Sequence, residues 1–191
     1  MVNKKICGAL ICNALLWYGC NSSSTVNSEK DTTVFYPIQQ YFNNELKGID
    51  SSYAITVVHT NEQGKKDTAN ISKTSLQLMA QPFLQANISD VTVKKYYTES
   101  SFYDETTNSY TFSYTTSNKE LPVQRVDVLL DTLSQQVKRV FISTYTTSDS
   151  ETIIRQSGWK TGNSFFINAV KQPKAGKEQT EQLAVEWKPN N

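Results

Sequence analysis

Residues 123–143 read VQRVDVLLDTLSQQVKRVFIS, and this stretch decides the fold class. Its first part alternates apolar with charged side chains, Val126 and Val128 against Arg125 and Asp127, which is the period of two typical of a half-buried strand. The segment DTLS, with Asp, Thr and Ser, then predicts a turn, and VKRVFIS predicts a second strand. Two strands joined by so short a turn predict an antiparallel hairpin.

The same pattern extends outward in both directions from this hairpin. Tyr110 and Phe112 belong to an alternating run on the N-terminal side, and Val185 and Trp187 to one on the C-terminal side. Short polar segments separate all the runs that follow Val91, and none of these segments is long or apolar enough to be a crossover helix. We therefore expect consecutive antiparallel hairpins, which is a β-meander.

Two segments upstream of the meander have apolar residues at helical spacing instead. Residues 34–49 place one apolar side chain every three or four positions, with Pro37 suited to the first turn and Gly48 to the end. Residues 73–85 repeat the pattern, and Pro82 should kink or split that helix. The expected fold is α+β, with two N-terminal helices packed on a strongly bent antiparallel β-sheet.

The start of the chain predicts export and a lipid anchor. Lys4 and Lys5 precede a mostly apolar run that is too short to span a membrane and ends at Gly19 and Cys20. A small residue before such a cysteine resembles a bacterial lipobox, although bulky residues stand just upstream. The alternatives are a secretory signal cleaved elsewhere and an N-terminal anchor helix.

On this interpretation, we expect the chain to have three parts and to be located in the cell envelope. Residues 1–19 are a lipoprotein signal peptide, residues 20–32 a flexible polar tether, and residues 33–191 a single α+β domain. Asn21 follows the cysteine where an aspartate would favour retention in the inner membrane, and residues 21–25 contain no acidic cluster of the kind that accompanies surface export. The expected location is the outer membrane, facing the periplasm.

Composition excludes several functions. The chain has 19 basic and 18 acidic residues, interspersed rather than clustered, so we expect no nucleic-acid partner. Its three cysteines are Cys7, Cys12 and Cys20, all at the N-terminus. A processed chain would therefore have no free thiol for a nucleophile, a thiolate metal site or a disulfide.

Three stretches carry a resemblance to a group of proteins. VFYPIQQYFNNELKGI (34–49), VQRVDVLLDTLSQQVKRVFIS (123–143) and GWKTGNSFFINAVKQ (158–172) together resemble small uncharacterised lipoproteins of Bacteroidetes. The likeness is one of pattern over most of the processed chain. It implies a lipid anchor at Cys20 and brings no activity with it.

Catalytic residues are hard to find in this sequence. His59 is the only histidine, and no cysteine or serine motif accompanies it. The pairs Asp104 with Glu105 and Asp149 with Glu151 are interpreted as solvated turn residues. No phosphate loop, zinc spacing or calcium loop is present. We therefore expect no enzymatic activity, no metal and no cofactor, and His59 to be a half-solvated strand residue.

Tyrosines form the most informative cluster. The candidate binding surface consists of tyrosines that the predicted hairpin would present to solvent: Tyr96, Tyr97, Tyr103, Tyr110 and Tyr114. The preferred hypothesis is a non-catalytic envelope lipoprotein that binds a protein or glycan partner through its sheet. The alternative is a carrier of lipid or another apolar ligand in a half-barrel, and an enzyme built on His59 is the least favoured.

Overall fold

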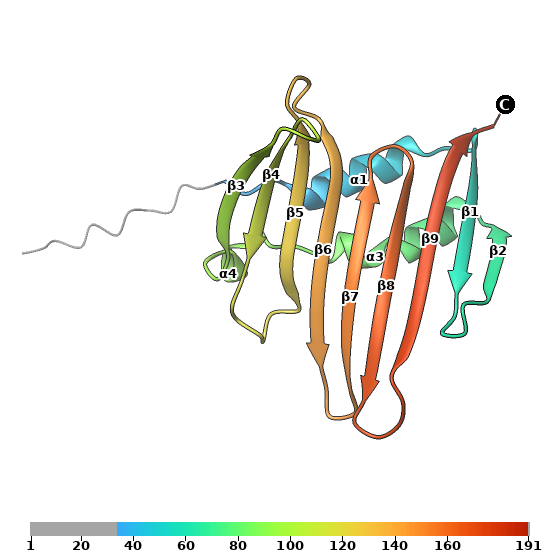
Figure 1. The fold of residues 1–191 in the computed structure, drawn as a ribbon. Helices are drawn as coiled ribbons and strands as arrows, with labels where there is room; N and C mark the ends of the chain where they lie inside the picture. Colours follow the sequence, from blue (N-terminus) through green and yellow to red (C-terminus); the bar gives the residue numbers. More distant parts are fainter. Residues whose placement is uncertain (1–33, 191) are drawn as a thin grey trace, which may run out of the picture. The chain divides into compact units, whose positions relative to one another are not determined.

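A computed structural model describes residues 34–190, which form mostly a single antiparallel β-sheet of nine strands with a few short helices (Figure 1). The predictions for the signal peptide, Cys20 and the tether lie outside the described residues. The strands are β1 (Tyr53–Thr60), β2 (Lys66–Asn70), β3 (Thr98–Asp104), β4 (Ser109–Thr115), β5 (Val123–Asp131), β6 (Val137–Thr147), β7 (Glu151–Lys160), β8 (Ser164–Pro173) and β9 (Gln179–Pro189).

The strand order is β2-β1-β9-β8-β7-β6-β5-β4-β3, and every pairing is antiparallel. Strands β3 to β9 follow one another in the sheet as they do in the chain, so the predicted meander is confirmed. The hairpin β1–β2 is added beyond β9, and Val57 of β1 lies opposite Val185 of β9. Because β2 and β3 are the two opposite edges, the chain between them must cross the whole sheet.

Within residues 34–190 four helices accompany the sheet: α1 (Ile38–Gly48), α2 (Lys73–Met79), α3 (Gln81–Leu84) and α4 (Val91–Lys94). In Figure 1, α1 and α3 lie behind the sheet and run across its strands. Helices α2, α3 and α4 belong to the segment that crosses from β2 to β3. No helix among residues 34–190 is long and apolar enough to cross a membrane.

The prediction of two N-terminal helices is not supported in that form. The first helix begins at Ile38, later than residue 34, and the hairpin β1–β2 follows it before any second helix. The predicted split of the second helix is confirmed, since the segment is divided at Ala80. Pro82 lies in the first turn of α3, where its missing N–H removes no helical hydrogen bond. Val91–Lys94 forms α4 rather than a strand, because Asp90 caps it by accepting from the N–H of Thr92 at 2.8 Å.

Aromatic side chains fill the space between the helices and the sheet. Trp159 of β7 is 1% exposed and contacts Phe42 of α1, Phe83 of α3 and Phe165 of β8, with ring centroids 5.2 Å apart in each pair. Trp187 of β9 packs on Trp159 at 5.3 Å. The indole of Trp159 therefore joins α1, α3 and three neighbouring strands in one core.

Polar contacts also tie α1 to the turn between β7 and β8. The carboxylate of Glu45 accepts from the indole N–H of Trp159 at 3.2 Å and from the backbone N–H of Gly162 at 2.7 Å. One turn earlier in the helix, the Tyr41 hydroxyl lies 2.7 Å from the Thr161 hydroxyl. Burial raises the pKa of Tyr41 well above its usual value. These contacts fix how α1 lies on the sheet.

Buried tyrosines predict a loss of stability in alkali. Burial raises the pKa of Tyr97 to about 12 and that of Tyr114 to about 12, from an ordinary value of about 10. The phenols contribute fully to stability below about pH 10, and the contribution is lost as the pH rises towards 12. We expect the free energy of unfolding, measured in urea at several pH values, to fall over this range.

The double variant Tyr97→Phe/Tyr114→Phe separates this effect from general alkaline damage. It should be less stable at pH 8, because the Tyr97 hydroxyl donates to Val123 O and the Tyr114 hydroxyl accepts from Tyr36 N. Each lost hydrogen bond should cost about 1 kcal/mol. The loss between pH 10 and 12 should nevertheless be smaller in the variant, and an equal loss in both proteins would contradict the prediction.

Candidate functional site

The predicted tyrosine surface is divided by the structure. Tyr114 is 2% exposed and belongs to the core, so it cannot be part of a binding surface. Tyr97 is half-buried, with its hydroxyl bonded to Val123 O at 2.7 Å. Tyr96, Tyr103 and Tyr110 are exposed. Of these three, the structure brings together Tyr103 and Tyr110, whose ring centroids are 5.2 Å apart across β3 and β4.

Two turns are joined beside this tyrosine pair. Asn108, in the β3–β4 turn, has a positive φ of 45°, which Asn tolerates better than most residues. Its side-chain oxygen accepts from the Tyr103 hydroxyl at 3.2 Å and from the Thr132 hydroxyl of the β5–β6 turn at 2.8 Å. Lys138 adds a bond from its Nζ to Thr107 O at 2.8 Å. The exposed tyrosine pair is therefore held on a fixed corner of the sheet.

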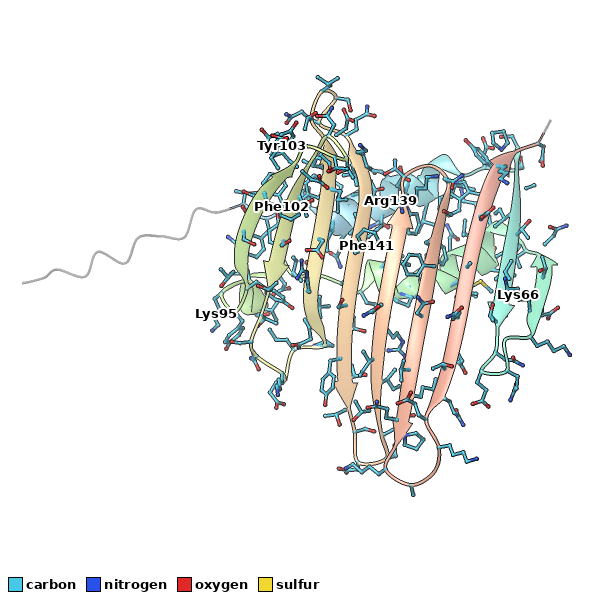
Figure 2. All side chains as sticks on the ribbon, viewed as in Figure 1. Lys66, Lys95, Phe102, Tyr103, Arg139 and Phe141 are labelled. Atoms are coloured by element: carbon cyan, nitrogen blue, oxygen red, sulfur yellow. The ribbon has the colours of Figure 1, made fainter. Side chains whose placement is uncertain are left out.

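The sheet face opposite the helices has no covering element among residues 34–190 (Figure 1). Cross-strand register places an apolar row at its centre, running across β6 to β9: Phe141, Gly158, Phe166 and Ala184. A Cβ on Gly158 would lie 2.3 Å from Cε1 of Phe166 and 3.0 Å from Cε1 of Phe141, so both rings lean over this glycine. Neither phenylalanine is fully buried, and Figure 2 labels Phe141 on this face.

Two cations border the apolar row. Arg139 of β6 and Lys160 of β7 are directly opposite each other in the register, and both are exposed. Within residues 34–190 neither side chain has a hydrogen bond or ion pair, whereas Arg125 on the same face bonds Asp127 at 2.7 Å. Like charges opposite each other on neighbouring strands repel. A hollow of about 180 Å³ lies among these cations, Phe141, Phe166 and Glu186.

On the other side of the apolar row lies a row of amides. Gln156, Asn168 and Gln182 are consecutive cross-strand neighbours on β7, β8 and β9. Strands are spaced about 4.8 Å apart, so the amides form a ladder with that repeat. None of the three side chains has a hydrogen-bond partner in the part of the chain that the structure describes. Each therefore offers both a donor and an acceptor to a ligand.

A groove lies on the helix-bearing face, next to α2 and α3. It has a volume of about 520 Å³ and includes Met79 and Pro82 from the helices and Ile167 and Leu183 from the strands. A smaller hollow of about 250 Å³ lies next to it, and Arg155 and Pro82 line both. The groove falls in the size range of small-ligand sites, which is roughly 300–1,000 Å³.

The residues considered for catalysis do not assemble. His59 is exposed near the end of β1, where it lies opposite Asp67 of β2 and Leu183 of β9. Asp104 accepts from the hydroxyl of Thr107 and from backbone N–H groups of the β3–β4 turn, and these hydrogen bonds hold its pKa below the usual range. Within residues 34–190 no group of three or more His, Cys, Asp or Glu side chains could hold a metal ion.

No protein-family model, curated protein or solved structure matches this chain. The candidate surfaces therefore rest on the geometry above. Sequence reasoning missed the cation pair, the phenyl pair, the amide row and Arg155, because their proximity comes from strand register. The apolar–polar alternation in GWKTGNSFFINAVKQ could have assigned faces within one strand, but not neighbours between strands.

Proposed function

We propose that this chain is a non-catalytic, lipid-anchored envelope protein whose uncovered sheet face binds an acidic glycan. The observation that carries the proposal is the amide ladder of Gln156, Asn168 and Gln182, which has no partners within residues 34–190. Neighbouring sugar hydroxyls need paired donors and acceptors, and side-chain amides supply both. The anchor on Cys20 and a periplasm-facing position in the outer membrane are parts of the same proposal.

The surroundings of the ladder favour a glycan over a protein partner. The rings of Phe141 and Phe166 offer an apolar surface to the C–H face of a sugar ring. Arg139 and Lys160 are suited to carboxylate or sulfate groups, since they have no counter-ion within residues 34–190. The apolar row on this face is also narrow and bordered by charged and amide side chains, whereas a stable protein interface has a broader apolar centre.

The experiment is affinity electrophoresis of the full chain through gels that contain dextran, polygalacturonate or dextran sulfate. We expect an acidic polysaccharide to retard the wild-type chain more than dextran does. Gln156→Ala/Asn168→Ala should weaken this binding by roughly 5- to 100-fold, since each lost hydrogen bond is worth about 0.5–1.5 kcal/mol.

The matched control is Gln179→Ala. Gln179 is an exposed amide on β9, the same strand as Gln182, but it lies on the helix-bearing face. This variant should bind like the wild type. If no polysaccharide retards the wild-type chain, the glycan proposal is wrong, and capture of a protein by the same face would be the next test.

A carrier of an apolar ligand is the second candidate function, and the groove beside α2 and α3 is the observation that favours it. Such a carrier needs a sheet that curves around its ligand. The strong bend that the sequence predicts is therefore part of this second proposal. It can be tested separately from the glycan proposal, because Gln156 and Asn168, the two amides replaced in the glycan experiment, do not line the groove. Gln182 is the one ladder residue that also borders it.

A further inference from the structure

Arg155 is the central charged residue of the groove on the helix-bearing face. It lies on β7 on the same face as Trp159, and its side chain is only partly exposed. It lines both the 520 Å³ groove and the 250 Å³ hollow beside it. Among residues 34–190 its guanidinium forms no hydrogen bond or ion pair. A partly buried guanidinium without a counter-ion is unfavourable unless something else neutralises it.

The other charges of the groove do not supply that counter-ion. Lys171 and Glu181 both line the groove, but they pair with each other at 2.9 Å. His59 is the remaining ionisable side chain of the lining, and it is not an acid. The described part of the groove therefore has a net positive charge centred on Arg155.

A second unsatisfied polar group lies next to Arg155. Thr144 of β6 is its cross-strand partner in the register, and both residues line the smaller hollow. The Thr144 hydroxyl oxygen is buried and has no hydrogen-bond partner within the described residues. Buried polar groups are nearly always paired. A ligand oxygen at this place could pair with both Thr144 and Arg155.

The walls of the groove on either side are apolar. Leu78 is 68% exposed at the end of α2, and Met79, Ile167 and Leu183 line the larger volume. Ala86 and Val123 line the smaller one. An exposed leucine beside a partly buried arginine suits a ligand that is apolar along its length and anionic at one point.

We propose that this groove binds an anionic amphiphile, an acyl-chain molecule with a single carboxylate or phosphate. The anionic head lies at Arg155 and Thr144, and the apolar chain lies along Met79, Ile167 and Leu183. The proposal deepens the carrier function and rests on it, and it does not depend on the glycan site. Charge complementarity selects the head group, and the apolar walls select the chain.

The test is photo-crosslinking of the full chain with a fatty acid that carries a diazirine on its acyl chain. A fatty alcohol with the same diazirine is the neutral counterpart. Peptide mapping by mass spectrometry locates the label. We expect saturable labelling by the acid within residues 73–84 and 164–183, and weaker labelling by the alcohol.

Arg155→Gln should weaken labelling by the acid about tenfold or more, the scale of a lost charge-assisted hydrogen bond. The alcohol should label both proteins alike. Arg139→Gln is the matched control, since Arg139 is also without a partner in residues 34–190 but lies on the opposite face. It should leave labelling unchanged. Circular dichroism establishes that each variant is folded.

Competition by dodecanoate and by dodecyl phosphate separates the two head groups, because the tighter competitor identifies the preferred anion. Equal labelling of the wild type and Arg155→Gln, or labelling mainly outside the groove, would overturn the proposal. An equal loss of labelling by the acid in Arg155→Gln and Arg139→Gln would also overturn the proposal. The polysaccharide experiment uses residues of the other face, so either proposal can fail without the other.

Discussion

Replacing Trp159 with alanine is expected to lower the free energy of unfolding by about 3–5 kcal/mol, the usual range for a buried Trp or Phe reduced to alanine. The cavity would open where α1, α3, β8 and β9 meet, because the indole contacts Phe42, Phe83, Phe165 and Trp187. The variant also leaves Glu45 without the indole N–H. The free energy of unfolding of a whole domain is commonly only about 5–15 kcal/mol, so a large share of the variant would be unfolded.

Urea denaturation followed by far-ultraviolet circular dichroism measures this loss. Leu133→Ala is the control, since Leu133 is 87% exposed in the β5–β6 turn and its replacement should cost less than about 0.5 kcal/mol. Trp159→Phe keeps one aromatic ring but removes the donor to Glu45 and part of the indole's volume, so its loss of stability should lie between those of Leu133→Ala and Trp159→Ala. A loss below about 1 kcal/mol for Trp159→Ala would show that this indole does not hold the core together.

Replacing Cys20 with serine is expected to abolish membrane attachment. Each buried CH₂ group of an acyl chain contributes about 0.8 kcal/mol, so a protein with two or more long chains stays on its membrane while the same protein without them does not. The variant should move from the membrane pellet to the soluble fraction, or accumulate as an unprocessed precursor. Ultracentrifugation of cell lysates and incorporation of labelled palmitate measure both outcomes.

Cys7 and Cys12 provide the matched controls for this experiment. Both are cysteines of the same N-terminal segment, and the proposed cleavage before Cys20 removes them. Cys7→Ser and Cys12→Ser should therefore pellet with the membrane and incorporate palmitate like the wild type. A Cys20→Ser chain that matches its parent in membrane pelleting, in palmitate incorporation and in molecular mass would rule out the lipobox interpretation and favour an anchor helix.

The strands that the sequence predicts well are those with two different faces. Val126 and Val128 face the core while Arg125 faces solvent, so burial imposes the alternation. Strand β2, KDTAN, was not predicted, because all five of its residues are exposed at the edge and hydrophobicity leaves no pattern there. The pairing of β1 with β9 was not predicted either, since period two identifies a strand but not its neighbour.

The predicted tyrosine surface also shows what hydrophobic alternation cannot predict, here for single residues. Tyr110 and Tyr114 lie on one face of β4, so alternation cannot separate them. The two tyrosines differ in whether another segment covers them. The ring of Phe35 packs on Tyr114, with centroids 4.7 Å apart, and the Tyr36 N–H donates to the Tyr114 hydroxyl. Tyr110 lies farther along the strand and stays 44% exposed. The lone His59 was expected to be a strand residue, and the structure places it in β1.

The pairing of β1 with β9 also constrains the order in which the fold can be completed. Tyr53 lies opposite Pro189, so one of the first strands to be made has its partner in the last one. During synthesis, or during passage through a membrane channel, β1 and β2 have no sheet to join until residues 179–189 have emerged. Contacts so distant in sequence slow folding and prolong the exposure of strand edges. The hairpin β1–β2 must therefore be kept from pairing with other chains over that interval, and its charged, fully exposed edge strand is suited to this.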